Sequence, residues 1–517
     1  MNTIKISLTL IITLFCAALS AESDRLSDAL EKADDNRAEL ERVLDHYQDD
    51  SLKYQAAVFL ISNMNGHGYM RYEMVDSSEE RIDFDVLDYE DYDALLEDVD
   101  RIEAERGSIS YQKQDFIEDL ENITADFLIE NIDYSFRAWR EKPWARNLSF
   151  EQFCAYILPY RGSNEPLESW RPILWEKYKD IESRMKDPAD PIEAAAIINN
   201  DIMSWFKFDE RYYYHPTDQG LTEMMQTQLG RCEDMTNLAI YAMRANGLAV
   251  TSDYTPHWAN TGNNHAWNAI VTPGGEVIPF MGAEANPGKY ELANKLAKAY
   301  RKMYAQQTNN LAFQEKKEES VPGWLNGKSY IDVTNDYVPT ADIDILFEKL
   351  IPDSADIAYL CVFNDAEWKP IDWARIDVGK NQAVFTNMGM EVAYLPALYL
   401  EEKVVPYADP FIMRADGIRR TFLPNNDILI DIEINATTKR APVKSTTGIK
   451  EKTLKGAAEY ELFYWDEGWQ SLAKETATSG SLIFEDVPSN ALYWLVEVDG
   501  DKDERIFSIE NGRLVWW

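Results

Sequence analysis

The sequence predicts an α+β protein of several domains. Its 517 residues exceed the length of one ordinary domain. Helical patterns fill the N-terminal third, helices and strands alternate in the centre, and short strands separated by turn residues dominate after residue 329. We therefore expect a helical N-terminal region at 22–187, an α+β core at 188–310, a connector at 311–328, and two β-sandwiches at 329–412 and 413–517.

The chain is strongly acidic. It contains 51 lysine and arginine residues against 90 aspartate and glutamate residues, which gives a formal net charge of −39. Nucleic acids require a basic surface, so we expect no DNA or RNA partner. Acidic residues are densest between Asp76 and Glu105, where we expect a solvated face. A calcium or cationic-ligand site is the alternative, although the spacing matches no ligand loop.

Residues 1–21 have the pattern of a signal peptide. Lys5 precedes a mostly apolar run from Ile6 to Leu19, and small residues follow it. A membrane anchor fits less well, because a span needs roughly 20 apolar residues. A lipoprotein at Cys16 fits less well too, because the bulky Phe15 precedes it. We predict cleavage near residues 20–21, export to the periplasm, the cell surface or the medium, and no membrane span in the mature chain.

Residues 22–187 show helical periodicity. Asp115 to Ala138 places large apolar residues mostly at three- and four-residue steps, the pattern of an amphipathic helix. Ser149 occupies a helix-cap position, and Pro172 to Met185 predicts another helix. No catalytic constellation is expected in this region.

Helices and strands alternate in the core at 188–310. A helix is predicted from Cys232 to Asn246, with Gly247 as its C-terminal stop. Strands are predicted at 248–255, 266–272 and 277–281, and Pro273-Gly274-Gly275 forms the hairpin turn between the last two.

Three cysteines remain after removal of the signal peptide. This is not the even, closely spaced set of a disulfide-stapled domain. Cys154 and Cys361 lie in apolar stretches and are interpreted as core residues. Cys232 begins a predicted helix, where the positive end of the helix dipole favours a thiolate. His265, in a later strand, is its candidate base.

This order of elements resembles the transglutaminase-like superfamily of cysteine enzymes, which shares its core arrangement with papain-like proteases. The resemblance rests on Gly230-Arg231-Cys232-Glu233-Asp234 and on His265-Ala266-Trp267 followed by the Pro-Gly-Gly turn, and it covers roughly residues 190–310. It implies that Cys232 is the nucleophile and His265 its base.

The resemblance also implies an aspartate that orients the histidine ring. That position falls here at Met281 or Gly282, neither of which can accept a hydrogen bond through its side chain. Glu284 is our candidate orienter, with Asn268 and Asn286 as weaker ones.

Other residues are candidates for binding the substrate. An oxyanion hole would use the Cys232 backbone N–H and an amide from Gln226 or Gln228. The remaining candidates for contact with substrate in the cleft are His257, Trp258, Trp267 and Asn268. For His257 and Trp258, which are expected on a loop, the alternative is simple packing.

No metal or cofactor is predicted. The histidines at 46, 67, 215, 257 and 265 have no ligand spacing, and the chain contains neither a Cys-x-x-Cys pair nor a Gly-rich phosphate loop. In the C-terminal β region, Trp465 and Trp469 flank a hairpin turn. We interpret them as core or cross-strand aromatics, with a sugar-stacking platform as the alternative.

Together these observations predict an exported cysteine enzyme that acts on amide bonds of peptides or proteins. It would hydrolyse them or transfer the acyl group through a Cys232 thioester, with His265 as base. The alternative is a catalytically silent scaffold of the same fold that binds peptide or glycan ligands.

Overall fold

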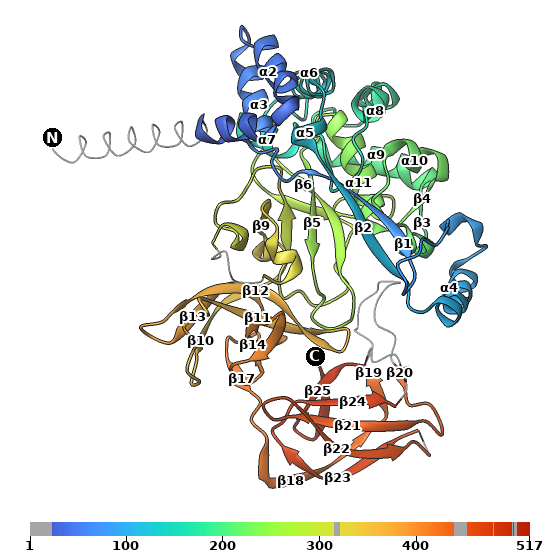
Figure 1. Ribbon diagram of the computed structural model, residues 1–517, viewed down its shortest axis with the longest axis vertical. Coiled ribbons are helices and arrows are strands. Elements are labelled where there is room, and N and C mark those ends of the chain that lie inside the picture. The colour runs from blue at the N-terminus through green and yellow to red at the C-terminus, as the bar shows by residue number, and fades with distance from the viewer. Residues whose placement is uncertain (1–22, 315–320, 439–451, 479, 499, 501–503) are drawn as a thin grey trace, which may run out of the picture. The chain divides into compact units, whose positions relative to one another are not determined.

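A computed structural model describes residues 23–314, 321–438, 452–478, 480–498, 500 and 504–517 (Figure 1). The predicted signal peptide lies outside the described residues. The chain divides into two compact units. The first contains the described residues up to Asp253, together with Ala266–Tyr290 and Lys302–Gln306. The second contains Tyr254–His265, Glu291–Arg301 and the described residues from Gln307 onward.

The fold mixes helices and strands, as predicted. The helices before the C-terminal β region begin with one over 23–32 and continue as α2 (Arg37–His46), α3 (Ser51–Ser62), α4 (Tyr92–Arg106), α5 (Asp119–Asn122), α6 (Ala125–Glu141), α7 (Phe150–Tyr156), α8 (Trp170–Tyr178), α9 (Pro191–Trp205), α10 (Leu221–Thr227) and α11 (Cys232–Ala245). The strands that accompany them are β1 (Gly68–Val75), β2 (Ser110–Glu118), β3 (Lys207–Phe208), β4 (Leu229–Gly230), β5 (Val250–Thr255), β6 (His265–Val271), β7 (Val277–Phe280) and β8 (Tyr300–Lys302). Within the described residues, none of the helices has both the length and the apolarity needed to cross a membrane.

The N-terminal region contains a β-ribbon that the sequence did not predict. Strands β1 and β2 pair antiparallel, so the helix expected from Asp115 onward is wrong over 115–118. The amphipathic helix α6 begins only after Thr124, whose side chain caps it. The pairing partner of β2 lies about forty residues earlier in the chain, and such non-local pairing can override a local helical pattern.

The acidic segment between Asp76 and Glu105 contains most of α4. Asp91 caps this helix by accepting a hydrogen bond from the Ala94 N–H at 2.9 Å. Asp76 departs from the expected solvated face, because it is buried and pairs with Arg106 at 2.6 Å.

Helix α11 is the centre of the first unit. Every residue from Asp234 to Ala245 is buried, and the helix packs against α6, α8 and α9 (Figure 1). It stops at Gly247, as predicted, because this residue has φ +72° and a Cβ there would lie 2.8 Å from the Ala138 carbonyl oxygen. The hairpin of β6 and β7 also forms as predicted, with Asn268 opposite Phe280.

Two buried arginines bind the segment between α7 and α8. Arg171 donates to the carbonyl oxygens of residues 157, 158 and 159, and Arg244 donates to those of residues 156, 159, 161 and 250. They are 2% and 5% exposed. Burial lowers the pKa of both side chains, and the charge of Arg244 lowers that of Arg171 further.

The second unit is rich in β-structure. Its strands are β9 (Tyr330–Asp332), β10 (Thr340–Leu346), β11 (Ile357–Asn364), β12 (Glu367–Asp377), β13 (Gln382–Gly389), β14 (Val392–Leu400), β15 (Lys403–Pro406), β16 (Phe411–Met413), β17 (Arg419–Thr421), β18 (Asn425–Ile434), β19 (Ala436–Thr438), β20 (Lys452–Thr453), β21 (Glu459–Trp465), β22 (Trp469–Thr476), β23 (Leu482–Ser489), β24 (Tyr493–Glu497), β25 (Ile506–Glu510) and β26 (Arg513–Trp516). An eight-stranded sheet has the order β10-β13-β12-β11-β14-β16-β17, with β15 on β14, and a five-stranded sheet has the order β22-β21-β24-β25-β26.

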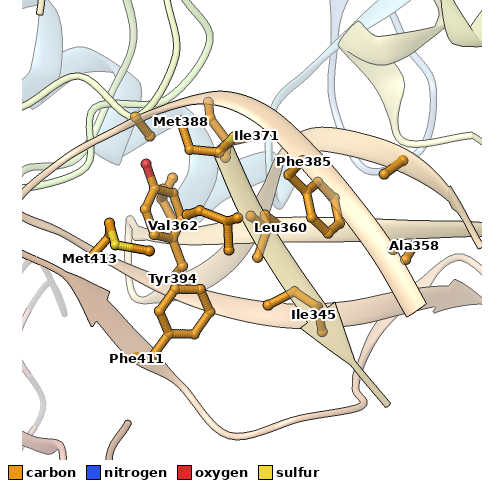
Figure 2. Close-up of a cluster of buried hydrophobic side chains, with 14 of the residues drawn as sticks. Ile345, Ala358, Leu360, Val362, Ile371, Phe385, Met388, Tyr394, Phe411 and Met413 are labelled. Atoms are coloured by element: carbon orange, nitrogen blue, oxygen red, sulfur yellow. The ribbon is translucent and has the colours of Figure 1, made fainter. Parts of the chain in front are cut away.

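Strand β11 is buried on both faces. Ala358, Leu360 and Val362 point into one apolar cluster (Figure 2), whereas Tyr359 and Cys361 belong to another that includes residues of the five-stranded sheet. This explains the continuous apolar run at 358–363. It also confirms Cys361 as a core residue, and Cys154 is buried in α7. The β-rich C-terminal region is as predicted, whereas its division into two sandwiches stays a proposal.

Candidate functional site

Cys232 is the first residue of α11, and its thiol lies beside the start of β6. The backbone N–H of Ala266, the second residue of β6, donates a hydrogen bond to Cys232 Sγ. The helix that carries the cysteine and the strand that carries the histidine therefore meet at their N-terminal ends.

The resting Cys232 side chain is a thiol. Burial raises its pKa to about 11, and the charges of Glu233 and Asp234 raise it further, whereas Arg231 and the Ala266 N–H lower it. The expectation of a thiolate from the helix dipole is therefore wrong for the resting site. Two carboxylates in the first turn of the helix oppose the dipole.

Charged side chains fix this first turn. Asp234 accepts hydrogen bonds from the Arg231 N–H at 2.9 Å and the Gln219 N–H at 3.0 Å. Arg231 pairs with Asp218 at 2.8 Å, and Lys302 pairs with Glu233. Burial, followed by the charge of Asp218, raises the pKa of Asp234 to about 6. These contacts hold the helix start among three carboxylates and two cations, Arg231 and Lys302.

His265 is the first residue of β6 and belongs to the second unit. Its ring stacks on Trp258, with ring centroids 5.8 Å apart. Burial lowers its pKa to about 4. The imidazole is therefore neutral at neutral pH, the form that can accept a proton.

Two tyrosines that the sequence did not single out as functional lie near the thiol. Burial raises the pKa of Tyr213 to about 12 and that of Tyr290 higher still, and the charge of Cys232 contributes to both. Both hydroxyls stay protonated at neutral pH and can donate hydrogen bonds. No local motif marks them, because their place near Cys232 depends on the tertiary fold.

Gly282, one of the two positions of the expected aspartate, has no room for a side chain. At Gly282 a Cβ would lie 2.3 Å from the Met235 carbonyl oxygen and 2.8 Å from Ala239 Cβ. The neighbouring Met281 is buried, 1% exposed. Close packing of this loop on α11 therefore explains why position 282 holds no carboxylate.

Glu284 lies on the same loop, which an isolated bridge between Met281 and Ala285 closes. The residue is exposed overall, while desolvation of its carboxyl group raises its pKa. The charge of the Glu284 carboxylate contributes to the raised pKa of Tyr290. A direct role in orienting His265 stays a prediction.

Of the two asparagines considered as weaker orienters, Asn268 binds backbone groups, whereas Asn286 accepts from Asn199 and donates to Asn200 Oδ1 at 2.9 Å. Asn268 is fully buried; it donates to the Thr236 carbonyl at 3.1 Å and accepts from the Gly282 N–H at 3.1 Å. Asn199, which the sequence analysis missed, donates to the Met281 carbonyl and to Asn286 Oδ1, both at 3.2 Å. Together they fix the 281–286 loop on α9 and α11.

The predicted oxyanion donors lie on α10 and at its end. Gln226 and Gln228 are both exposed. Gln228 has a left-handed backbone with φ 58° and lines a shallow pocket of about 140 Å³ with Lys177 and Trp205. Their role stays a prediction.

The cleft candidates fall into two groups. Trp267 and Asn268 are completely buried, which leaves them no surface for a ligand, so we reassign both to the core. His257 and Trp258 lie on the loop before β6, as predicted. Burial, followed by the charge of Lys369, lowers the pKa of His257 to about 4. Across the described residues, no group of three or more His, Cys, Asp or Glu side chains is arranged to hold a metal ion.

A comparison with known protein families finds a match for the central part of the chain. Residues 179–280 match the model of a family described as the transglutaminase-like superfamily. The matched segment includes Cys232 and His265 and ends before Glu284. No curated protein matches the chain.

Proposed function

Because residues 179–280 form a transglutaminase-like domain, we propose that the protein is a cysteine enzyme that acts on amide bonds. The observation that carries this proposal is the meeting of α11 and β6, where the Ala266 N–H binds Cys232 Sγ next to His265. Peptide or protein amides are the proposed substrates, and export with residues 1–21 as signal peptide is part of the proposal.

The pKa values favour general-base activation of a neutral thiol over a preformed ion pair. With a pKa of about 4 for His265 and about 11 for Cys232, the resting pair is an imidazole and a thiol. The imidazole takes the thiol proton as the sulfur attacks the amide carbon, so that the S–C bond forms with the proton transfer. Substrate binding need not first create a thiolate.

The later steps return the site to its starting state. The imidazolium protonates the leaving amine as the C–N bond breaks, which leaves a thioester on Cys232. Water or a second amine then loses a proton to His265 and attacks the thioester, and the thiol recovers that proton. The Cys232 backbone N–H is the proposed first oxyanion donor, because the first backbone N–H groups of a helix have no partner within it.

Acyl-enzyme trapping tests this function. With activated esters and peptide amides, we expect wild-type protein to gain the mass of one acyl group on Cys232, as located by peptide mass spectrometry. Cys232→Ala should lose the adduct, because no thiol remains at the helix start. Cys154→Ala is the matched control and should keep it, because Cys154 is a buried residue of α7. Acylation of another residue, or none with the whole panel, would contradict the proposal.

The second candidate function is the silent scaffold that binds a glycan, and one pocket of the second unit favours it. This pocket of about 550 Å³ is lined by the aromatic residues Trp368, Tyr399, Trp465 and Trp469. Glu367, Lys369, Glu402 and Lys403 also line it. Sugar hydroxyls both donate and accept hydrogen bonds, so they match carboxylates and ammonium groups, while sugar rings stack on aromatic faces.

Glycan binding would depend on the half-buried Trp469, since Trp465 is only 3% exposed. In calorimetric titrations with neutral oligosaccharides, Trp469→Ala should weaken binding at least about tenfold, as loss of a central aromatic contact does. Trp516→Ala, a half-buried tryptophan outside the pocket, should not. Equal affinities of the two variants, or no binding by wild type, would exclude this pocket as a glycan site.

A further inference from the structure

The loop over 257–264 leads directly into His265 and has neither helix nor strand of its own. Its shape therefore depends on contacts from elsewhere. The main contact is Asn364, the fully buried last residue of β11. Its Nδ2 donates to the carbonyl oxygens of Trp258 at 3.0 Å, Thr261 at 2.9 Å and Asn263 at 2.9 Å. One side chain thus binds the loop at three points.

Asn364 sits on a rigid support. It pairs with Glu367 across the hairpin of β11 and β12, and the two residues between them, Asp365 and Ala366, have φ 47° and 62°. Positive φ at both central residues is the pattern of a tight two-residue hairpin turn. Asp365 accepts a hydrogen bond from the Asn263 N–H at 3.2 Å. A Cβ at Gly262 would lie 2.0 Å from Asp365 Oδ1, so a larger residue there would displace this carboxylate.

Arg505, the residue just before β25, supports the same loop. Its guanidinium is 3% exposed and donates to the carbonyl oxygens of Ala259 at 3.0 Å and Phe363 at 2.7 Å. Its Nε donates to the carbonyl oxygen of Trp517 at 3.1 Å. The loop is therefore bound by two side chains, one at the end of β11 and one just before β25, that lie more than a hundred residues away in sequence.

These contacts bear on the histidine through Trp258. The carbonyl of Trp258 is bound by Asn364, and its N–H donates to the Asn263 carbonyl at 3.2 Å. The Trp258 ring then stacks on His265. Fixing the backbone of Trp258 fixes the surface against which the imidazole rests.

We propose that Asn364 and Arg505 are positioning residues for His265, so that the C-terminal β region is part of the proposed catalytic machinery. The catalytic consequence rests on the proposed cysteine-enzyme function, whereas the effect on the imidazole does not. In the transglutaminase-like pattern a carboxylate from the loop after β7 would orient the ring. Met281 and Gly282 cannot supply one. The contacts of Asn364 and Arg505 with the 257–264 loop offer a second means of holding the His265 ring in place.

The test follows His265 by NMR titration in the full-length chain, with the signal assigned from His265→Asn. In wild type the imidazole should titrate near its pKa of about 4. Asn364→Leu has a similar volume but no donor, so the loop should loosen, water should reach the ring, and the pKa should rise by at least about one unit toward 6.5. With an active substrate, kcat should fall roughly 10- to 100-fold and KM should change little.

Asn381→Leu is the matched control. Asn381 also lies in a tight turn of the second unit with positive φ, and it donates to the carbonyl oxygens of Phe347 and Lys349, away from the loop. The Asn381→Leu variant should lose about as much stability as Asn364→Leu, and the pKa of its His265 should stay at the wild-type value. Identical His265 titrations in Asn364→Leu and Asn381→Leu would overturn the proposal.

A second variant covers the case in which Asn364→Leu does not fold. Arg505→Lys keeps the positive charge and loses the guanidinium that reaches three carbonyls, and it should shift the His265 titration in the same direction. No shift in this variant would also count against the proposal. A shift without amide-bond activity in wild type would contradict the proposed function and leave the positioning role standing.

Discussion

Replacing His265 with asparagine should lower kcat/KM for an amide substrate by about 10²- to 10⁴-fold, the usual contribution of a positioned general base. The physical reason is the high pKa of Cys232, about 11, set by burial and by its acidic neighbours. At neutral pH almost no thiolate is present, so the thiol needs a base to accept its proton. Asparagine keeps a similar shape but cannot accept a full proton.

The pH dependence makes this prediction sharper. In wild type, kcat/KM should rise through the His265 pKa of about 4, because only the neutral imidazole can act as base. It should then stay flat toward the Cys232 pKa of about 11. In His265→Asn, the rate should follow the thiolate fraction instead and increase about tenfold per pH unit across the neutral range.

His67→Asn is the matched control for this pair of measurements. Burial also lowers the pKa of His67, but this residue lies between α3 and β1, where its Nε2 donates to the Tyr304 carbonyl oxygen. We expect its variant to keep the flat profile with a change of only a few fold. A flat profile in His265→Asn, or a profile in wild type that rises through the neutral range, would contradict the general-base role of His265.

The sequence predicted the elements of this site better than its electrostatics. Cys232 at a helix start and His265 in a strand were found because both residue types are scarce and stand in the order of a known family. The prediction of a thiolate failed, although one cause of the raised thiol pKa was visible in the sequence: Glu233 and Asp234 directly follow the cysteine. The dipole of the helix was weighed without the charges in its first turn.

Other features could not be read from the sequence because they depend on contacts between distant segments. Asn199 and Asn364 look like ordinary polar residues in apolar elements, yet each binds several backbone groups of a loop beside the site. The same holds for β2, whose partner β1 comes from a separate segment. Local periodicity identified α11 correctly and α6 without its start, because both helices bury an apolar face.

Packing also explains the departure from the family pattern at the third catalytic position. Gly282 approaches the backbone of α11 so closely that a side chain would displace the helix, and its N–H is bound by Asn268. A carboxylate at this position would need a different path of the loop. The sequence revealed that the aspartate is missing, whereas only the structure gives the steric reason.

The buried arginine pair supports α11 from its far end and should be the most sensitive point of the first unit. Arg244→Met should lower the free energy of unfolding by about 3–5 kcal/mol, because removal of the guanidinium leaves several buried carbonyl groups without a donor. Loss of a buried cation offsets part of this cost, since Arg171 and Arg244 repel each other. For the same reason the double variant with Arg171→Met should cost more than the sum of the single variants, because each single variant already relieves the one repulsion between the two cations.

Hydrogen exchange of the peptides that contain residues 156–161 measures this effect locally, which avoids the assumption of two-state unfolding in a chain with two compact units. The control is Arg137→Met, which removes a half-exposed arginine paired with Glu141 and should cost less than about 1 kcal/mol. Equal protection losses in Arg244→Met and Arg137→Met would show that the carbonyl groups of this segment find other donors. The expected difference follows from burial alone. Both variants remove one guanidinium, but only Arg244→Met leaves buried carbonyl groups without a hydrogen-bond donor.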